Sequence, residues 1–77
     1  MSNKTIEDIC TTLHDIRREK KVSLNVMADL ADIDKSTLSK YERGLKLPKL
    51  DTLEKWSNTL GYTVSINLHK ALVEVEA

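Results

Sequence analysis

Two short helical segments separated by only three residues constrain the fold of this 77-residue chain more than any other feature. Ser23 can start the first segment, which ends near Ala31, and the second runs from Lys35 to about Arg43. A connection as short as residues 32–34 fixes two helices at a steep angle, because the chain has no room to fold the second back along the first. The pair therefore predicts a second helix that projects from the surface.

The second segment has too few apolar residues to bury most of its surface. Asp34 is a suitable N-cap for it, and Gly44 can end it in the left-handed conformation. Leu38 and Tyr41 are expected to hold it to the core. The remaining face consists of two lysines and two hydroxyl side chains: Lys35, Ser36, Ser39 and Lys40. Since an α-helix of about 10–12 Å fits the B-DNA major groove, which is about 12 Å wide, these four residues can reach base edges or phosphates there.

Apolar spacing predicts one further helix on each side of this pair. The first runs from about residue 5 to residue 20, and the last follows Pro48, which forbids a helix through its loop, and stops at Gly61. The residues expected on the inner faces are Ile6, Ile9, Leu13 and Ile16 in the first helix, Met27, Leu30 and Ala31 in the second, and Leu50, Leu53, Trp56 and Leu60 in the last.

The hydrophobic period changes to two after Gly61. Val64, Ile66 and Leu68 alternate with polar residues, which predicts a strand from about residue 62 to residue 69. A lone strand must pair, either with the tail as a hairpin or with the same strand of a second subunit. No good turn dipeptide precedes the tail, so we favour a homodimer paired through these three apolar residues. The expected division is a helical DNA-binding domain at 1–61 and a dimerisation or partner element at 62–77.

The charge of the chain sums to zero but is concentrated in one stretch. Residues 35–49 contain five basic residues and one acidic residue, Glu42, so this stretch carries +4 and, because the total is zero, the rest carries −4. Local positive charge on one face attracts a polyanion, since salt screens charges beyond about 10 Å at 0.1 M. Together with the outward helix face, this charge favours double-stranded DNA as the partner.

The single cysteine and the hydropathy of the chain indicate the cellular compartment in which the protein is expected. The single Cys10 cannot form an internal disulfide, which favours a reducing environment. No apolar run approaches the roughly 20 residues of a membrane span, and the amino terminus has no signal-peptide pattern. We therefore expect a cytoplasmic protein with no membrane contact.

No residue pattern points to an enzyme or to a metal centre. The chain has no glycine-rich phosphate loop, no Ser/His/Asp arrangement and no paired carboxylates. Cys10 and His14 lie one helical turn apart and could supply two metal ligands, but no second pair accompanies them. We interpret them as a packed thiol and a surface imidazole, and we expect no catalytic residues and no cofactor.

About two-thirds of the chain, residues 6–61, resembles the Cro/C1-type (XRE) helix-turn-helix domains of phage repressors and bacterial regulators. The motifs that carry the resemblance are "VS" at the start of the second helix, "ADLA" within it, "STLSKYERG" and "PKLDTLEKWSNTLG". It implies a mainly α, lambda-repressor-like fold of four or five helices, usually dimeric, that represses transcription from a palindromic operator. The strand-like end is similar to that of antitoxins in this superfamily, so a toxin-neutralising protein that autoregulates its operon is the alternative function.

The resemblance also implies roles for individual positions. Lys35, Ser36 and Lys40 match positions that touch base edges, and Ser39 lies beside them, where it can touch a base or the backbone. These four residues are the predicted base contacts. The positions that match DNA backbone contacts are Ser23, Asn25, Thr37, Arg43 and Lys46. Arg17 and Glu42 match a partly buried structural ion pair. The chain departs from the family at Leu24, where a bracing glutamine is common, and at Lys21 and Asp32, where glycine is common; Lys21 is expected to carry modest backbone strain.

Overall fold

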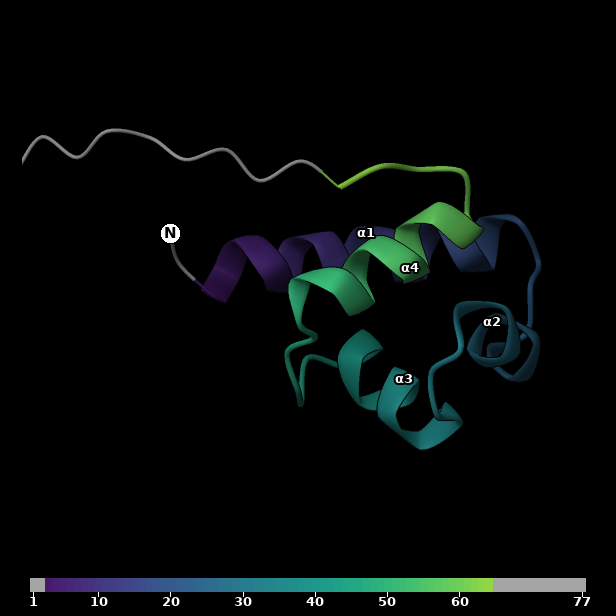
Figure 1. Ribbon diagram of the computed structural model, residues 1–77, viewed down its shortest axis with the longest axis horizontal. Coiled ribbons are helices and arrows are strands. Elements are labelled where there is room, and N and C mark those ends of the chain that lie inside the picture. Colours follow the sequence, from purple (N-terminus) through teal and green to yellow (C-terminus); the bar gives the residue numbers. More distant parts are fainter. Residues whose placement is uncertain (1–2, 65–77) are drawn as a thin grey trace, which may run out of the picture.

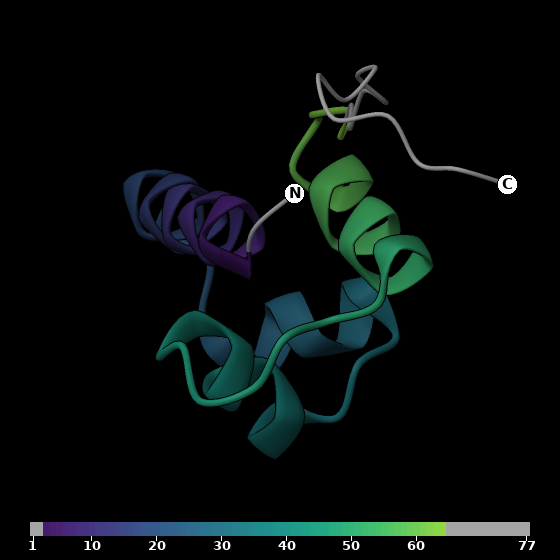
Figure 2. The same cartoon turned by 90° about the vertical axis from the view of Figure 1, so that its left-hand side faces the viewer.

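The computed structural model describes residues 3–64, which form four helices around one core (Figure 1). These are α1 (Asn3–Glu19), α2 (Leu24–Ala31), α3 (Lys35–Glu42) and α4 (Leu50–Thr59). Helix α2 packs against α3 and α4, and α3 also packs against α1. Figures 1 and 2 show α1 and α4 on one side of the core and α2 and α3 on the other. The mainly α, four-helix part of the predicted fold is confirmed. No helix within residues 3–64 is long and apolar enough to cross a membrane.

The predicted C-terminal strand is described only at its first three residues. Tyr62, Thr63 and Val64 continue the chain after α4 and belong to no strand. Ile66 and Leu68 lie outside the described residues, as does most of the predicted element at 62–77. Strand pairing across a dimer, and the division of the chain at residue 61, therefore stay predictions.

The core is aliphatic with one aromatic pair at its centre. Among the residues that the structure describes, ten apolar side chains are buried: Cys10, Leu13, Met27, Ala28, Ala31, Leu38, Tyr41, Leu53, Trp56 and Leu60. The rings of Tyr41 and Trp56 stack with centroids 6.3 Å apart and an interplanar angle of 27°. Leu38 is fully buried, so α3 is anchored by the two residues predicted for that role. Burying a leucine side chain contributes about 1.5–3 kcal/mol. Burial of Leu38 therefore stabilises the packing of α3 on the core, although most other residues of α3 are polar.

Two leucines predicted on inner faces lie at the surface instead. Leu30 is 60% exposed and Leu50 is 51% exposed. The buried stripe of α2 is formed by Met27, Ala28 and Ala31, and Leu30 is rotated away from its centre because each residue turns the helix by about 100°. Leu50 is the first residue of α4 and precedes its buried residues Leu53, Trp56 and Ser57. Both predictions were wrong.

Each of the four helices in the described part of the chain ends in the same left-handed turn, the Schellman motif. The left-handed residues are Lys21, Asp32, Gly44 and Gly61, with φ of 59°, 56°, 75° and 86°. After α1, for example, the Lys21 amide donates to the carbonyl of Arg18 at 3.0 Å and the Val22 amide to that of Arg17 at 3.1 Å. Glycine adopts this conformation freely, whereas other residues carry a cost of about 1–2 kcal/mol, so Lys21 and Asp32 hold strained backbone.

The starts of α2 and α3 are capped by the predicted residues. Ser23 Oγ accepts a hydrogen bond from the Val26 amide at 3.2 Å, and Asp34 Oδ2 accepts one from the Ser36 amide at 3.2 Å. Such caps satisfy amides that a helix leaves without partners at its first turn. The two helices of the short-turn pair are therefore closed at both ends by local interactions.

Candidate nucleic-acid interface

Helix α3 is held at the outer edge of the molecule by the three-residue turn that precedes it. Figures 1 and 2 show α3 at the lower edge, on the side away from the chain segment that follows α4. The turn closes through the Ile33 amide, which donates to the carbonyl of Ala28 at 2.9 Å, and the Ile33 side chain packs against the core. Since Leu38 and Tyr41 face inward, the opposite face of α3 is presented to solvent.

The structure brings the four predicted base-contacting residues together on this outer face. Lys35, Ser36 and Lys40 are exposed, and Ser39 is half-buried. At 3.6 residues per turn, Ser39 stacks one turn after Lys35, and Lys40 stacks one turn after Ser36. The face therefore offers two flexible ammonium donors and two hydroxyls on consecutive turns of one short helix.

The hydroxyl of Ser36 is already engaged with the residue that caps α3. Ser36 Oγ donates to Asp34 Oδ2 at 2.5 Å, next to the amide bond that caps the helix. This hydrogen bond from the Ser36 side chain, with those from the backbone amides of Thr37 and Ser36 and the charge of Lys40, lowers the pKa of the Asp34 carboxyl from its ordinary value of 3.8. Asp34 is therefore ionised at neutral pH. Sequence reasoning identified the cap but missed its bond to the Ser36 side chain.

The residues predicted to contact the DNA backbone lie at the start of α2, within α3 and just after it. Ser23, Asn25, Arg43 and Lys46 are exposed, and Thr37 is half-buried. Arg43 Nε donates to the carbonyl of Ser39 at 3.4 Å, which keeps this guanidinium beside the last turn of α3. Lys46 follows the left-handed turn at Gly44. The amino end of α2 adds backbone amides of the kind that bind phosphate oxygens.

Arg17 and Glu42 form a bidentate ion pair between α1 and the end of α3. Arg17 Nε lies 2.8 Å from Glu42 Oε2, and Nη2 lies 2.9 Å from Oε1. The two side chains are 12% and 6% exposed. Glu42 is the acidic residue of the basic stretch 35–49, so this pairing removes a negative charge from the solvent-facing side of α3. The exposed charge of that stretch comes from its lysines and Arg43.

Exposed apolar residues next to the basic ones were not expected from the sequence. Leu45, Leu47 and Leu50 are 65%, 36% and 51% exposed, and they alternate with Lys46, Pro48 and Lys49. The apolar–basic alternation in "LKLPKL" was the available signal, and Pro48 is the buried residue within it. Leu45 and Leu47 thus lie in the loop between α3 and α4 with Lys46 and Lys49, and Leu50 begins α4.

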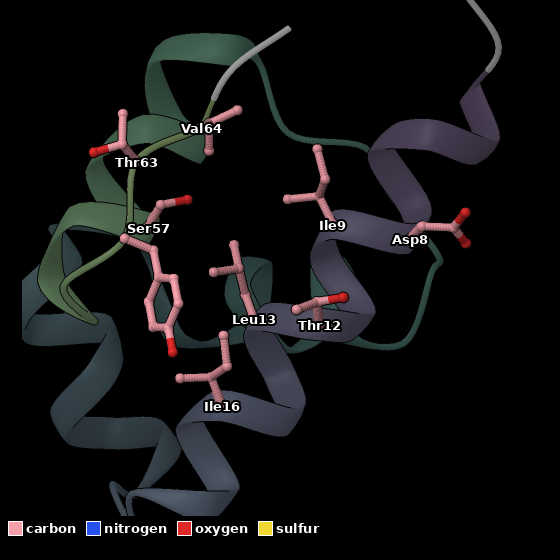
Figure 3. A pocket seen from close by; sticks show the side chains of 9 residues that line it. Asp8, Ile9, Thr12, Leu13, Ile16, Ser57, Thr63 and Val64 are labelled. Carbon is pink, nitrogen blue, oxygen red and sulfur yellow. The ribbon is translucent and has the colours of Figure 1, made fainter.

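A groove of about 440 Å³ lies on another side of the molecule, between α1 and the segment that follows α4. Figure 3 shows Ile9, Leu13 and Ile16 along its α1 wall, with Val64 opposite. Tyr62, half exposed, also lines it. Val64, a predicted dimerisation residue, is partly buried against the core of its own chain, whereas Ile66 and Leu68 lie outside the described residues. The groove is apolar and carries no catalytic arrangement of side chains.

The candidate metal ligands behave as a packed thiol and a partly exposed imidazole. Cys10 is 2% exposed, and burial, together with the charges of Glu7 and Glu42, raises its pKa to about 11. His14 Nδ1 lies 3.3 Å from Asp15 Oδ1. Within residues 3–64 no three His, Cys, Asp or Glu side chains are grouped so as to hold a metal ion.

These features define a helix-turn-helix module, and comparison with known proteins gives the same class. The helix-turn-helix family HTH_3 matches residues 13–67. The HTH-type transcriptional regulator DdrOP3 of Deinococcus deserti is 38% identical over 56 residues, which cover 73% of this chain and 43% of that protein. The chain thus spans less than half the length of this curated relative.

Two solved structures share the fold. The clp gene regulator ClgR from Corynebacterium glutamicum matches with a TM-score of 0.69 and 28% identity, over 74% of this chain and 61% of that one. SinR, a master regulator for biofilm formation solved in complex with DNA, matches with a TM-score of 0.66 and 38% identity, over 71% and 89%. The chain belongs to the helix-turn-helix family HTH_3, which confirms the Cro/C1-type resemblance. All three relatives are named as regulators, the class of protein that the sequence predicts in place of an enzyme.

Proposed function

We propose that this protein is a transcriptional repressor that binds a palindromic operator as a homodimer and blocks transcription by occupying it. The observation that carries this proposal is the outer face of α3, where Lys35, Ser36, Ser39 and Lys40 lie together above the buried Leu38. A helix of this width fits the major groove, and lysine and serine side chains are suitable partners for base edges. SinR, which shares this fold, has been solved in complex with DNA.

The basic and polar residues around the outer face of α3 are proposed to contact the DNA backbone. Arg43 and Lys46, with Ser23 and Asn25 at the start of α2 and Thr37 within α3, contact phosphates and set the position of α3 over the bases. Pairing of Glu42 with Arg17 supports this role, because it leaves the neighbouring cations without an exposed acidic partner from the same stretch. Contacts of this kind supply affinity that does not depend on sequence.

Dimerisation is proposed to place two α3 helices in successive major grooves about 34 Å apart on one face of the duplex. The alternation of Val64 with Ile66 and Leu68 supports a pairing element after α4. The apolar groove between α1 and Val64 supports it further, since residues at its rim such as Tyr62 remain half exposed in a single chain. A two-fold dimer would explain recognition of a palindrome.

Selection of bound duplexes from a random library, followed by affinity measurements at several salt concentrations, tests the proposal. We expect a two-fold symmetric sequence to be enriched, and the logarithm of affinity to fall with the logarithm of salt by about 0.9 for each phosphate contacted. A shuffled duplex of the same composition is the control for sequence preference. Affinity that does not change with salt would contradict a DNA-binding role.

The antitoxin function stays a prediction from the sequence. It depends on the tail, of which residues 65–77 lie outside the described part of the chain. Co-purification from the native host tests it: a stoichiometric toxin partner would support the antitoxin, and a homodimer alone would favour the stand-alone repressor.

A further inference from the structure

A hydrogen bond inside the N-terminal turn of α3 limits what Ser36 can offer to a base. A serine hydroxyl has one proton to donate and two lone pairs that accept. Ser36 Oγ lies 2.5 Å from Asp34 Oδ2, and both residues are exposed at the proposed DNA face. One of these two oxygens must donate a proton to the other. The position of that proton decides whether Ser36 is a hydrogen-bond donor or acceptor toward DNA.

The proton belongs to Ser36. An ionised carboxylate accepts hydrogen bonds and donates none. Asp34 Oδ2 also accepts the Ser36 amide at 3.2 Å, so the carboxylate is held by two donors of one residue. Hydrogen bonds from a hydroxyl to an ionised oxygen are short, about 2.5–2.7 Å, and roughly twice as strong as neutral ones. A base acceptor, being neutral, competes poorly with this carboxylate for the proton.

We propose that Ser36 acts only as a hydrogen-bond acceptor toward DNA and so selects an exocyclic amine, adenine N6 or cytosine N4, at the base pair it meets. These two amines are the major-groove donors of DNA. The flanking Lys35 and Lys40 only donate, so the outer face of α3 presents an acceptor between donors. This inference rests on the proposed DNA-binding function and adds to it the kind of base edge that one residue reads.

Ser39 provides the matched control on the same helix. Its side chain is half-buried on the same face, and no hydrogen bond of its hydroxyl to another side chain is present among the described residues. Ser39 can therefore donate or accept, whereas Ser36 is committed to Asp34. Two serines three positions apart are thus expected to differ in the base edges they tolerate.

Deleting single functional groups from the selected operator tests the proposal. The base pair that Ser36 reads is the one whose preference is lost in Ser36→Ala but kept in Ser39→Ala. At that pair, purine in place of adenine, or 2-pyrimidinone in place of cytosine, removes the amine, and 7-deazapurines remove the N7 acceptor. We expect amine removal to weaken binding of the intact protein by about five- to tenfold, the effect of one lost hydrogen bond, and N7 removal to change it less than about twofold. Ser36→Ala should be insensitive to both deletions.

The outcomes separate this inference from the proposed function. If no duplex is enriched over random DNA, the proposed function fails. If an operator is enriched but N7 removal costs more than amine removal, or no base pair depends on Ser36, the acceptor-only role is overturned while the DNA-binding function stands. Asp34→Gly frees the Ser36 proton and keeps a residue type that N-cap positions tolerate. It should lower the penalty of amine removal and create one for N7 removal; an unchanged pattern would overturn the inference.

Discussion

The Arg17 guanidinium holds the Glu42 carboxylate through two parallel hydrogen bonds of 2.8 and 2.9 Å, and it also donates from Nη1 to the carbonyl of Val22 at 2.7 Å. One side chain thereby connects α1, the turn after α1 and the last residue of α3. The orientation of α3, which sets the direction of its outer face, depends on this connection together with the burial of Leu38. The pair therefore links the stability of the fold to the geometry of the candidate interface.

Removing one partner of this pair should destabilise the fold strongly. Glu42→Ala leaves the Arg17 guanidinium, 12% exposed, without its carboxylate, and we expect a loss of about 3 kcal/mol in the free energy of unfolding. Urea denaturation followed by circular dichroism measures it. The double variant with Arg17→Met and Glu42→Leu should recover much of this loss, because it leaves no buried charge. A loss below about 1 kcal/mol in Glu42→Ala would show that the pair is only a surface contact.

Lys21→Gly should stabilise the protein. Lys21 has φ of 59°, a conformation that glycine adopts without the cost of about 1–2 kcal/mol that other residues carry. Glycine loses more chain entropy on folding, so the expected net gain is about 0.5–1 kcal/mol, measured by thermal or urea unfolding. Lys20→Gly is the matched control: its amide donates to the Ile16 carbonyl at 2.9 Å, which continues the helical bonding pattern one residue past α1, and glycine there should destabilise. Equal effects of the two changes would contradict the left-handed assignment.

The Asp34 carboxyl should titrate below its ordinary value of 3.8 in the folded protein. Because the folded pKa is depressed, the stability contributed by this carboxylate is present above the unfolded pKa and is lost as pH falls through the folded one. Ser36→Ala should raise the pKa of Asp34, since the Ser36 hydroxyl is the largest cause of the shift, and Ser39→Ala should leave it unchanged. Titration of the carboxyl carbon by NMR measures both. No change in Ser36→Ala would remove the basis for an acceptor-only Ser36.

Ile66→Lys should convert the proposed dimer to monomers and weaken operator binding. Ile66 falls on the same side of the sequence alternation as Val64, and a charge there would have to be buried between subunits at a cost of several kcal/mol. Light scattering gives the mass of each variant. Asn67→Lys, on the opposite side of the alternation, should stay dimeric. A dimer that survives Ile66→Lys would place the subunit contact elsewhere.

Local signals in the sequence were enough for the helix-turn-helix pair and not for the contacts that join distant segments. Ser23, Asp34 and Gly44 are capping residues whose effects act within one turn, so their roles were predictable from neighbours alone. The exposure of Leu30 depends on how α2 is rotated about its axis against α3 and α4. The spacing of apolar residues within α2 does not determine that rotation. Arg17 and Glu42, 25 residues apart, were paired only by family resemblance, since no periodicity connects them.

The Asp34–Ser36 bond was missed for a different reason. The sequence predicts a cap at Asp34 and a base contact at Ser36, and neither prediction includes the hydrogen bonds that join the two residues. A hydroxyl two positions after an acidic N-cap lies within reach of the capping carboxylate, because the two residues lie at the start of the same first turn. This spacing is visible in the sequence and was the signal available.

The affinities of wild type, Lys40→Ala and Lys46→Ala for the selected operator and for random DNA, measured across a range of salt, test the central claim most directly. If α3 reads bases, Lys40→Ala should reduce the preference for operator over random DNA by about tenfold, the effect expected for one specific base contact. Lys46→Ala should weaken binding to both duplexes alike and reduce the salt slope by about 1. Equal losses of preference in both variants would contradict the assignment of α3 as the recognition helix.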